Sequence, residues 1–298
     1  MSNYQLSGRF GSGCGGKSLA GEGALLAVSD LHISYAENRR VVDRLQPGSP
    51  EDWLIVAGDV GEVFADIEKT LLTLRDRFQK VIWAPGNHEL WTHPADPVQL
   101  RGEERYRALV QMCRDVGVLT PEDEYPVWQG GGSPVVVVPL FQLYDYSFRI
   151  PGADTREESL RRAYDAGVVC TDEVLLHHDP YPSREEWCWD RIRETERRLD
   201  ALDPSLPTVL ISHWPLIRQP TDVLWFPEFA QWCGTERTAD WHTRYRAIVT
   251  VYGHLHIPRT TEYDGVRFEE VSLGYPREWS RLSGGAPDPI RLILGPGR

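Results

Sequence analysis

The chain has 298 residues, a formal net charge of −12, 41% hydrophobic residues and 26% charged residues. This length and composition are typical of a globular protein with a substantial core. No Lys- or Arg-rich run occurs, so we do not expect a groove for a nucleic-acid backbone. A small phosphorylated substrate stays compatible with the negative charge, because bound metal ions can reverse the local field.

The five cysteines lie at positions 14, 113, 170, 188 and 233, and no CxxC pair occurs. An odd and scattered set of cysteines indicates free thiols in a reducing compartment. The sequence shows no signal-peptide pattern, and no apolar run approaches the roughly 18 residues that a membrane-spanning helix needs. We therefore expect a cytoplasmic protein without a membrane partner; the sequence leaves its oligomeric state open.

Residues 1–23 are rich in Gly and Ser and predict a flexible arm ahead of a single domain over residues 24–298. Within this arm, residues 11–18 match the phosphate-loop pattern GxxxxGK[ST]. That motif needs a strand before it and a helix after it. Here residues 19–23 contain two glycines and lead into a strand, so we interpret the segment as part of the arm and not as a nucleotide site.

From residue 24 onward, short apolar runs that suit buried strands alternate with helical periodicity. The runs are 24–29, 53–57, 81–84, 135–139, 208–211 and 248–252. The clearest helix is predicted between the second and third runs, where apolar residues from Val60 to Phe78 recur every three or four positions. This alternation predicts an α/β fold.

Two regions depart from that alternation. Residues 266–273 and 290–294 are predicted to be strands without an intervening helix, which favours an antiparallel extension. Residues 140–190 mix aromatic, proline and charged residues. We expect them to form a lid or cap beside the site, followed by a helix over 183–200, with the whole insertion spanning about 140–205.

Polar residues follow five of the predicted strands, at the point where each strand ends. In open α/β sheets, ligands bind at the carboxyl ends of strands, so we expect these residues to converge. Carboxylate, amide and imidazole groups without thiolate favour Mn, Fe, Zn, Co or Mg. The candidate residues are Asp30, His32, Asp59, Asn87, His88, His213, His254 and His256.

These motifs resemble the calcineurin-like metallophosphoesterase superfamily. The match runs in chain order from residue 30 to residue 256, which is most of the chain. The resemblance implies a four-layer α/β/β/α sandwich, in which two packed mixed sheets are flanked by helices. The matching strings are Asp30-x-His32, Gly58-Asp59, Gly86-Asn87-His88-Glu89, Ser212-His213 and Gly253-His254-x-His256.

The resemblance also implies two divalent ions, with Mn, Fe, Zn and Co as the candidates. Asp30, His32 and His256 would bind the first ion. Asn87, His213 and His254 would bind the second, and Asp59 would bridge both.

His88 would not bind metal. It would stand near the leaving-group oxygen as general acid or transition-state stabiliser. The implied reaction is hydrolysis of a phosphate ester by in-line attack of a hydroxide that bridges the ions.

Three functions stay open on the sequence. A phosphomonoesterase for a small phosphorylated metabolite or nucleotide is our first expectation, and a phosphodiesterase for a cyclic nucleotide or another diester is the alternative. A binding scaffold without catalysis is disfavoured, because no motif position is eroded. A protein Ser/Thr phosphatase is disfavoured too, because the Asp-Arg pair of that branch is missing from residues 59–63, which read Asp-Val-Gly-Glu-Val.

Substrate contacts are expected from aromatic and basic residues near the motifs. Phe141, Tyr144 and Tyr146 follow the run at 135–139, where an aromatic face could stack on a base or a sugar-like ring. A guanidinium group is a common phosphate partner, and an imidazole close after the third motif is within reach of the site. The remaining candidates are His93, Arg184 and Arg218.

Overall fold

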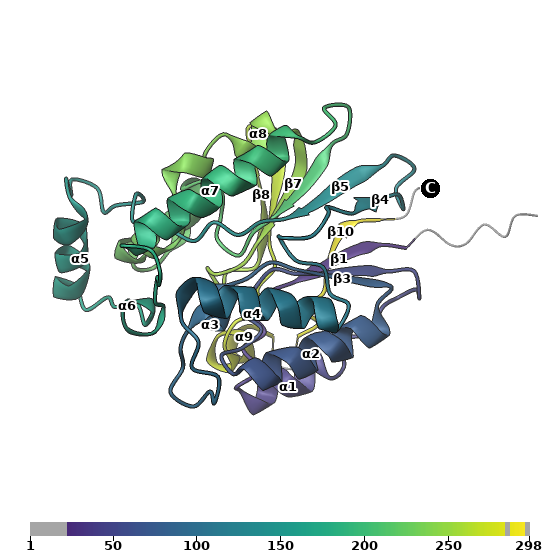
Figure 1. Cartoon of the computed structure of the whole chain (residues 1–298), viewed down its shortest axis with the longest axis horizontal. Helices are drawn as coiled ribbons and strands as arrows, with labels where there is room; N and C mark the ends of the chain where they lie inside the picture. The colour runs from purple at the N-terminus through teal and green to yellow at the C-terminus, as the bar shows by residue number, and fades with distance from the viewer. Residues whose placement is uncertain (1–22, 284–286, 296–298) are drawn as a thin grey trace, which may run out of the picture.

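The computed structural model describes residues 23–283 and 287–295. Nearly all of the predicted arm, including the segment 11–18, lies outside these residues, so its flexibility and its division from the rest of the chain stay predictions. Two β-sheets pack face to face, and helices cover the outer face of each sheet (Figure 1). The predicted four-layer α/β/β/α arrangement is confirmed.

The first sheet has the strand order β10-β1-β2-β3, and the second has the order β4-β5-β6-β7-β9-β8. The strands of the first sheet are β1 (Leu25–Val28), β2 (Trp53–Val56), β3 (Lys80–Trp83) and β10 (Arg291–Leu294). Those of the second are β4 (Val127–Trp128), β5 (Val135–Pro139), β6 (Thr208–Ile211), β7 (Ala247–Tyr252), β8 (Arg259–Tyr263) and β9 (Val266–Glu270).

Helices α1 to α4 and α9 lie on the side of the first sheet, and α7 and α8 lie on the side of the second (Figure 1). The α-helices are α1 (Ala36–Val42), α2 (Phe64–Arg77), α3 (Asn87–Leu90), α4 (Gly102–Asp115), α5 (Arg156–Asp165), α6 (Asp172–Leu175), α7 (Arg184–Asp200), α8 (Trp241–Arg244) and α9 (Pro276–Ser283). The short 3₁₀ helices in the described ranges are η1 (Gln219–Val223), η2 (Pro227–Trp232) and η3 (Glu236–Thr238).

The central strands are apolar on both faces because both faces are covered. On β1, Leu25 and Ala27 belong to the core between the two sheets, whereas Leu26 and Val28 belong to the core beneath the helices. Side chains alternate along a strand, so a strand buried on both faces shows a continuous apolar run and no alternation. This explains why runs of apolar residues located the central strands correctly.

The prediction for the C-terminal region was partly wrong. Strand β10 is antiparallel to β1 as expected, but β9 is parallel to β7, and helix α9 separates β9 from β10. The reason is β8, which forms the sheet edge and turns back, so that β9 inserts between β7 and β8 in the parallel direction.

The expected helix over 183–200 is confirmed as α7, and the hydroxyl of Ser183 accepts a hydrogen bond from the Glu186 amide at its start. Helix α7 covers the second sheet, while α5 and α6 project beyond the end of the sandwich (Figure 1). The extent of a cap over about 140–205 remains a prediction.

Within the described ranges, no helix combines the length and apolar character needed to cross a bilayer. The four cysteines in these ranges are buried free thiols, as the cysteine pattern predicted. Burial raises the pKa of each thiol well above its usual value, so these groups are poor nucleophiles.

Candidate metal centre and active-site cleft

The ends of β1, β2, β3, β6 and β7 bring the predicted polar residues into one cluster. His32 Nε2 lies 3.1 Å from His256 Nε2, and His256 Nε2 lies 3.0 Å from Asp30 Oδ1. On the other side, His213 Nε2 lies 3.3 Å from Asp59 Oδ2 and 3.2 Å from His254 Nδ1. Residues up to 226 positions apart in the sequence therefore form a single site.

Several of these residues have a left-handed backbone conformation that side chains with a Cβ rarely adopt. The φ angles are 54° at Asp30, 40° at His32, 55° at Asp59, 69° at His254 and 54° at His256. Such conformations cost on the order of 1–3 kcal/mol each and cluster at functional sites, where the surrounding structure enforces them. The sharp turn after each strand is what directs these side chains into the cluster.

Two glycines let the loops that contain them pass close to the candidate carboxylate ligands. A Cβ at Gly86 would overlap the carboxylate of Asp59, and a Cβ at Gly253 would overlap the carboxylate of Asp30. Any side chain at either position would displace a candidate ligand. The glycine of each motif is thus required by the geometry of the neighbouring carboxylate.

The donor atoms fit a metal cation. Ligand atoms of Asp30, His32 and His256 lie within 4.8 Å of one another, as do those of Asp30, Asp59 and His213. Among the residues that the structure describes, no polar partner contacts the buried Nε2 of His254. Buried polar atoms normally have hydrogen-bond partners. Imidazole nitrogens and carboxylate oxygens that face one another with no donor between them are the arrangement that a bound cation would satisfy.

Second partners orient two of the imidazoles. His213 Nδ1 lies 2.9 Å from the Ala57 carbonyl oxygen, which can only accept, so Nδ1 carries a proton and Nε2 is the ring nitrogen that faces the cluster. His256 Nδ1 lies 2.9 Å from Glu278 Oε2, which orients its Nε2 toward Asp30 in the same way. Metal-binding histidines typically have such partners.

The protonation states of most candidates suit a cation. Burial by itself would raise the pKa of Asp30 and Asp59, but the neighbouring histidines outweigh burial and lower both. Burial lowers the pKa of His254 to about 3, with the charge on His213 acting in the same direction. Burial opposes the charged form of His213, yet Asp59 and Asp30 raise its pKa to about 9, so a cation there would displace a proton.

His88 lies beside this cluster and is held by a carboxylate that sequence analysis did not select. Its Nδ1 lies 2.8 Å from Glu62 Oε1, its ring packs on Trp91 at 3.7 Å between centroids, and its Nε2 lies 3.8 Å from Asp59 Oδ2. Burial disfavours the charged imidazole, but Asp59 and Glu62 outweigh burial and raise the pKa of His88. Glu62 follows the candidate ligand Asp59 by only three positions, and that proximity is the signal that could have revealed it.

Replacing Glu62 by glutamine is expected to lower kcat/KM at neutral pH about tenfold, which is the worth of one charge-assisted hydrogen bond of ~1.5 kcal/mol. The carboxylate raises the pKa of His88, so its loss lowers that pKa. The alkaline limb of the pH profile of kcat/KM should then move to lower pH, whereas Glu62→Asp should restore part of the shift. An unmoved limb in Glu62→Gln would show that His88 is not the titrating group.

Glu89, the last residue of the third motif, has a structural role. Its carboxylate accepts hydrogen bonds from the backbone amides of Asp59 and Val60, both at 2.9 Å, and from the amide of Gly86. Burial raises the pKa of Glu89 to about 7. This side chain ties the turn after β2 to the turn after β3 and so fixes Asp59 relative to Asn87.

Asp172 on α6 connects the predicted insertion to the cluster. Its fully buried carboxylate accepts hydrogen bonds from Asn87 Nδ2 at 2.9 Å, from Trp91 Nε1 at 2.6 Å and from the Tyr144 hydroxyl at 3.0 Å. Because the amide nitrogen of Asn87 is engaged, its Oδ1 faces His213 Nε2 at 3.1 Å. No local motif marks Asp172, so its role could not be predicted from the sequence.

Replacing Asp172 by asparagine is expected to raise the metal concentration needed for half-maximal activity by about 10- to 100-fold, as loss of a partner behind a metal ligand typically does. The neutral amide cannot accept three hydrogen bonds from donors as strongly as the carboxylate does. Metal titrations of the chelator-treated protein measure the change. Asp165→Asn, an exposed carboxylate on α5, is the control and should leave the titration unchanged.

A cavity of about 370 Å³ opens above the cluster. Its walls include Asp59, His88, Trp91, Tyr275 and Arg277. Trp91, Tyr275 and Arg277 were not selected from the sequence, because helix α9 was not predicted and Trp91 carries no motif of its own. An exposed guanidinium at the mouth of the cavity makes Arg277 a candidate phosphate partner.

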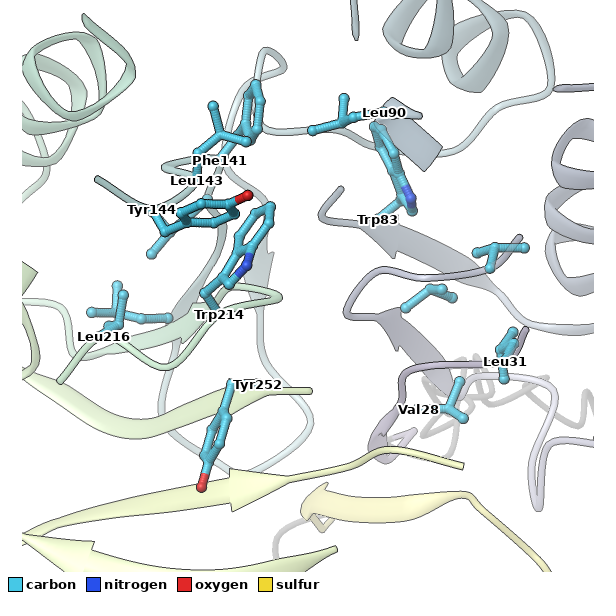
Figure 2. Packing of buried hydrophobic residues seen from close by; sticks show 14 of the residues in the cluster. Val28, Leu31, Trp83, Leu90, Phe141, Leu143, Tyr144, Trp214, Leu216 and Tyr252 are labelled. Carbon is cyan, nitrogen blue, oxygen red and sulfur yellow. The ribbon is translucent and has the colours of Figure 1, made fainter. Parts of the chain in front are cut away.

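The aromatic residues that were expected to touch substrate lie elsewhere. Phe141, Tyr144 and Tyr146 are at most 1% exposed and belong to the core; none of them lines the cavity. Figure 2 shows Phe141 and Tyr144 packed near Trp214. Burial of these rings stabilises the fold, so we do not retain them as substrate contacts.

The three polar candidates are also outside the cavity lining. Arg184 is buried and binds the Tyr146 hydroxyl, Glu173 and two backbone carbonyls, which is a structural role. His93 is half-buried, and its Nδ1 accepts from the Ala95 amide in a local turn. Arg218 is half-buried at the start of η1. The structure brings none of them to the cluster.

Comparison with known proteins adds independent findings. The family model described as calcineurin-like phosphoesterase matches residues 24–258. The [acyl-carrier-protein] phosphodiesterase PptH of Mycobacterium tuberculosis is 56% identical over 269 residues, which cover 90% of this chain and 83% of that protein. The crystal structure of the phosphopantetheinyl hydrolase PptH from Mycobacterium tuberculosis superimposes with a TM-score of 0.90 at 55% identity, covering 93% of this chain and 97% of that one. This chain therefore belongs to the calcineurin-like phosphoesterase family and is a metal-dependent phosphoesterase.

Proposed function

We propose that this enzyme is a phosphodiesterase that releases 4′-phosphopantetheine from a carrier protein. The observation that carries the proposal is the similarity to PptH over nearly the whole of both chains, at 55% identity. Phosphopantetheine is attached to a carrier protein through a serine hydroxyl, so the bond to be cleaved belongs to a phosphodiester. This supports the alternative that the sequence left open, a diester, over our first expectation of a monoester.

The substrate is then larger than the small phosphorylated molecule that we first expected. The carrier protein stays outside the cavity, and only the modified serine and its phosphate need to enter. The negative charge of the chain matters little at the site if two divalent ions are bound, with Mn, Fe, Zn and Co still the candidates.

The proposed ligands follow the geometry of the cluster. Asp30, His32 and His256 would hold one ion. Asp59 would serve both ions, because its Oδ2 lies 4.0 Å from His32 Nε2 and 3.3 Å from His213 Nε2. The second ion would be held by Asn87, His213 and His254. When bound, the ions supply a nucleophile at neutral pH by lowering the pKa of water toward ~7, and they offset phosphate charge.

The residues of the chain complete the reaction. His88 directs Nε2 toward the cavity while Glu62 holds Nδ1, so the imidazolium is oriented to give its proton to the serine oxygen as the P–O bond breaks. The oxygen of water ends on phosphorus, the serine regains its hydroxyl, and 4′-phosphopantetheine leaves as a monoester. Arg277 at the mouth of the cavity is placed to pair with the phosphate oxygens.

The test is incubation of the metal-loaded enzyme with a purified phosphopantetheinylated carrier protein. Intact-mass spectrometry should show conversion to the carrier protein with an unmodified serine, together with release of free 4′-phosphopantetheine. Cleavage of aryl phosphate monoesters in preference to diesters, with an unchanged carrier protein, would contradict the proposal.

A further inference from the structure

An apolar groove of about 740 Å³ leads outward from the cavity above the cluster. It is bounded by the segment after α5, the connection from η1 to η2, the loop after β7, and helix α9. The groove and the cavity are continuous, because Val169, Phe229, Leu255 and Arg277 line both. A ligand held at the cluster can therefore extend directly into the groove.

The groove exposes large apolar side chains that a folded protein usually buries. Trp225 is 92% exposed, Val169 is 69% exposed and Phe226 is 62% exposed. All three line the groove. Single exposed apolar residues are common, but a contiguous apolar patch with a polar rim marks a binding site. Arg277 and Arg281 supply that rim.

We propose that this groove binds the pantetheine arm of the substrate; the inference rests on the proposed phosphodiesterase function. The phosphorus atom must lie at the cluster for the reaction to occur, and two ester substituents are attached to it. One is a serine on the surface of a folded carrier protein, whose short side chain reaches the cavity while the protein itself stays outside the groove. The other is a flexible linear chain with a dimethyl group near the phosphate, two amides and a terminal thiol.

The lining of the groove matches that chain from the phosphate outward. Phe229 stands at the junction, with its ring stacked against His254 at 5.8 Å between centroids, so the dimethyl carbons next to the phosphate can pack on an apolar face. Arg277, held over the ring of Tyr275 at 5.3 Å, offers donors to phosphate or amide oxygens. Trp225 and Phe226 then cover the distal part of the arm.

The experiment measures inhibition of bis(4-nitrophenyl) phosphate hydrolysis by 4′-phosphopantetheine and by inorganic phosphate. Both inhibitors present a phosphate to the cluster, and they differ only by the arm. We expect phosphopantetheine to inhibit at about tenfold lower concentration, because burying a few apolar groups contributes roughly that factor. The double variant Trp225→Ala/Phe226→Ala should lose most of this tenfold difference.

Val174→Ala is the matched control, because Val174 is 71% exposed on α6 and lies outside the groove lining. It should keep the tenfold ratio of inhibition constants. Since all three substituted side chains are exposed, the core is not altered, and thermal unfolding of each variant checks this directly.

The outcomes separate the groove from the proposed function. If the ratio of inhibition constants is the same in the double variant and in the wild type, the groove does not bind the arm. A double variant with weaker binding of the modified carrier protein but an unchanged ratio would also overturn the inference, because the groove would then contact the protein surface. A third outcome is that the wild type leaves the modified carrier protein intact while the ratio of inhibition constants still falls in the double variant. In that case the proposed function fails and the assignment of the groove stands.

Discussion

Replacing Asp59 by asparagine is expected to lower kcat/KM for a phosphate diester about a thousandfold and to reduce the bound metal. One oxygen of Asp59 lies 3.3 Å from His213 Nε2, 3.8 Å from His88 Nε2 and 4.0 Å from His32 Nε2, so it faces both halves of the cluster. Loss of its charge removes several kcal/mol of charge stabilisation, and each ~1.4 kcal/mol is a factor of ten.

Elemental analysis of the desalted variant and steady-state kinetics at saturating metal test this expectation. Asp66→Asn is the control, because Asp66 is a half-buried residue on α2 that lies outside the cluster, with 46% of its side chain accessible. An Asp59→Asn protein with full metal content and a rate near that of the wild type would remove Asp59 from the site.

Replacing His88 by alanine is expected to lower kcat by about a thousandfold when the leaving group is a serine alkoxide, within the range of roughly 10²–10⁴ for general acid catalysis. With 4-nitrophenolate the loss should be far smaller, because that anion leaves readily without a proton. The comparison requires the same variant and two diesters, a phosphopantetheinylated carrier protein and bis(4-nitrophenyl) phosphate.

Metal content discriminates between two roles for His88. Its ring nitrogen lies within 4.8 Å of ligand atoms of His32 and Asp59, so a metal-binding role is geometrically open. We expect His88→Ala to keep its metal, since Glu62 already holds Nδ1. If His88→Ala lowered kcat equally for both diesters and also lost its bound metal, His88 would be a metal ligand and not the proton donor.

The position of the motifs at the ends of strands could be predicted from the sequence, because each motif lies directly after its apolar run. The apolar runs mark strands buried on both faces, and the residues after them must lie at one edge of each sheet. An apolar run does not indicate the backbone conformation of the residues that follow it. The left-handed conformations of Asp30 and His254 could therefore not be predicted from the sequence and are seen only in the folded structure.

The predictions for the insertion were less successful because its contacts are long-range. Asp172 is 85 positions from Asn87, and no pattern within residues 140–190 indicates that a buried carboxylate reaches this candidate metal ligand. The same segment contains aromatic residues such as Tyr144, and aromatic residues are as common in the core of a protein as in a substrate pocket. Their burial shows that they stabilise the fold.

The hydrogen bond between Asp172 and Asn87 has a consequence for redesign of this enzyme. The segment that lines the apolar groove at Val169 also contains Asp172, whose carboxylate holds the candidate metal ligand Asn87. An exchange of this segment for that of a relative with another substrate would therefore change metal retention together with selectivity. A chimera has to keep the carboxylate at position 172, or the two properties cannot be varied separately.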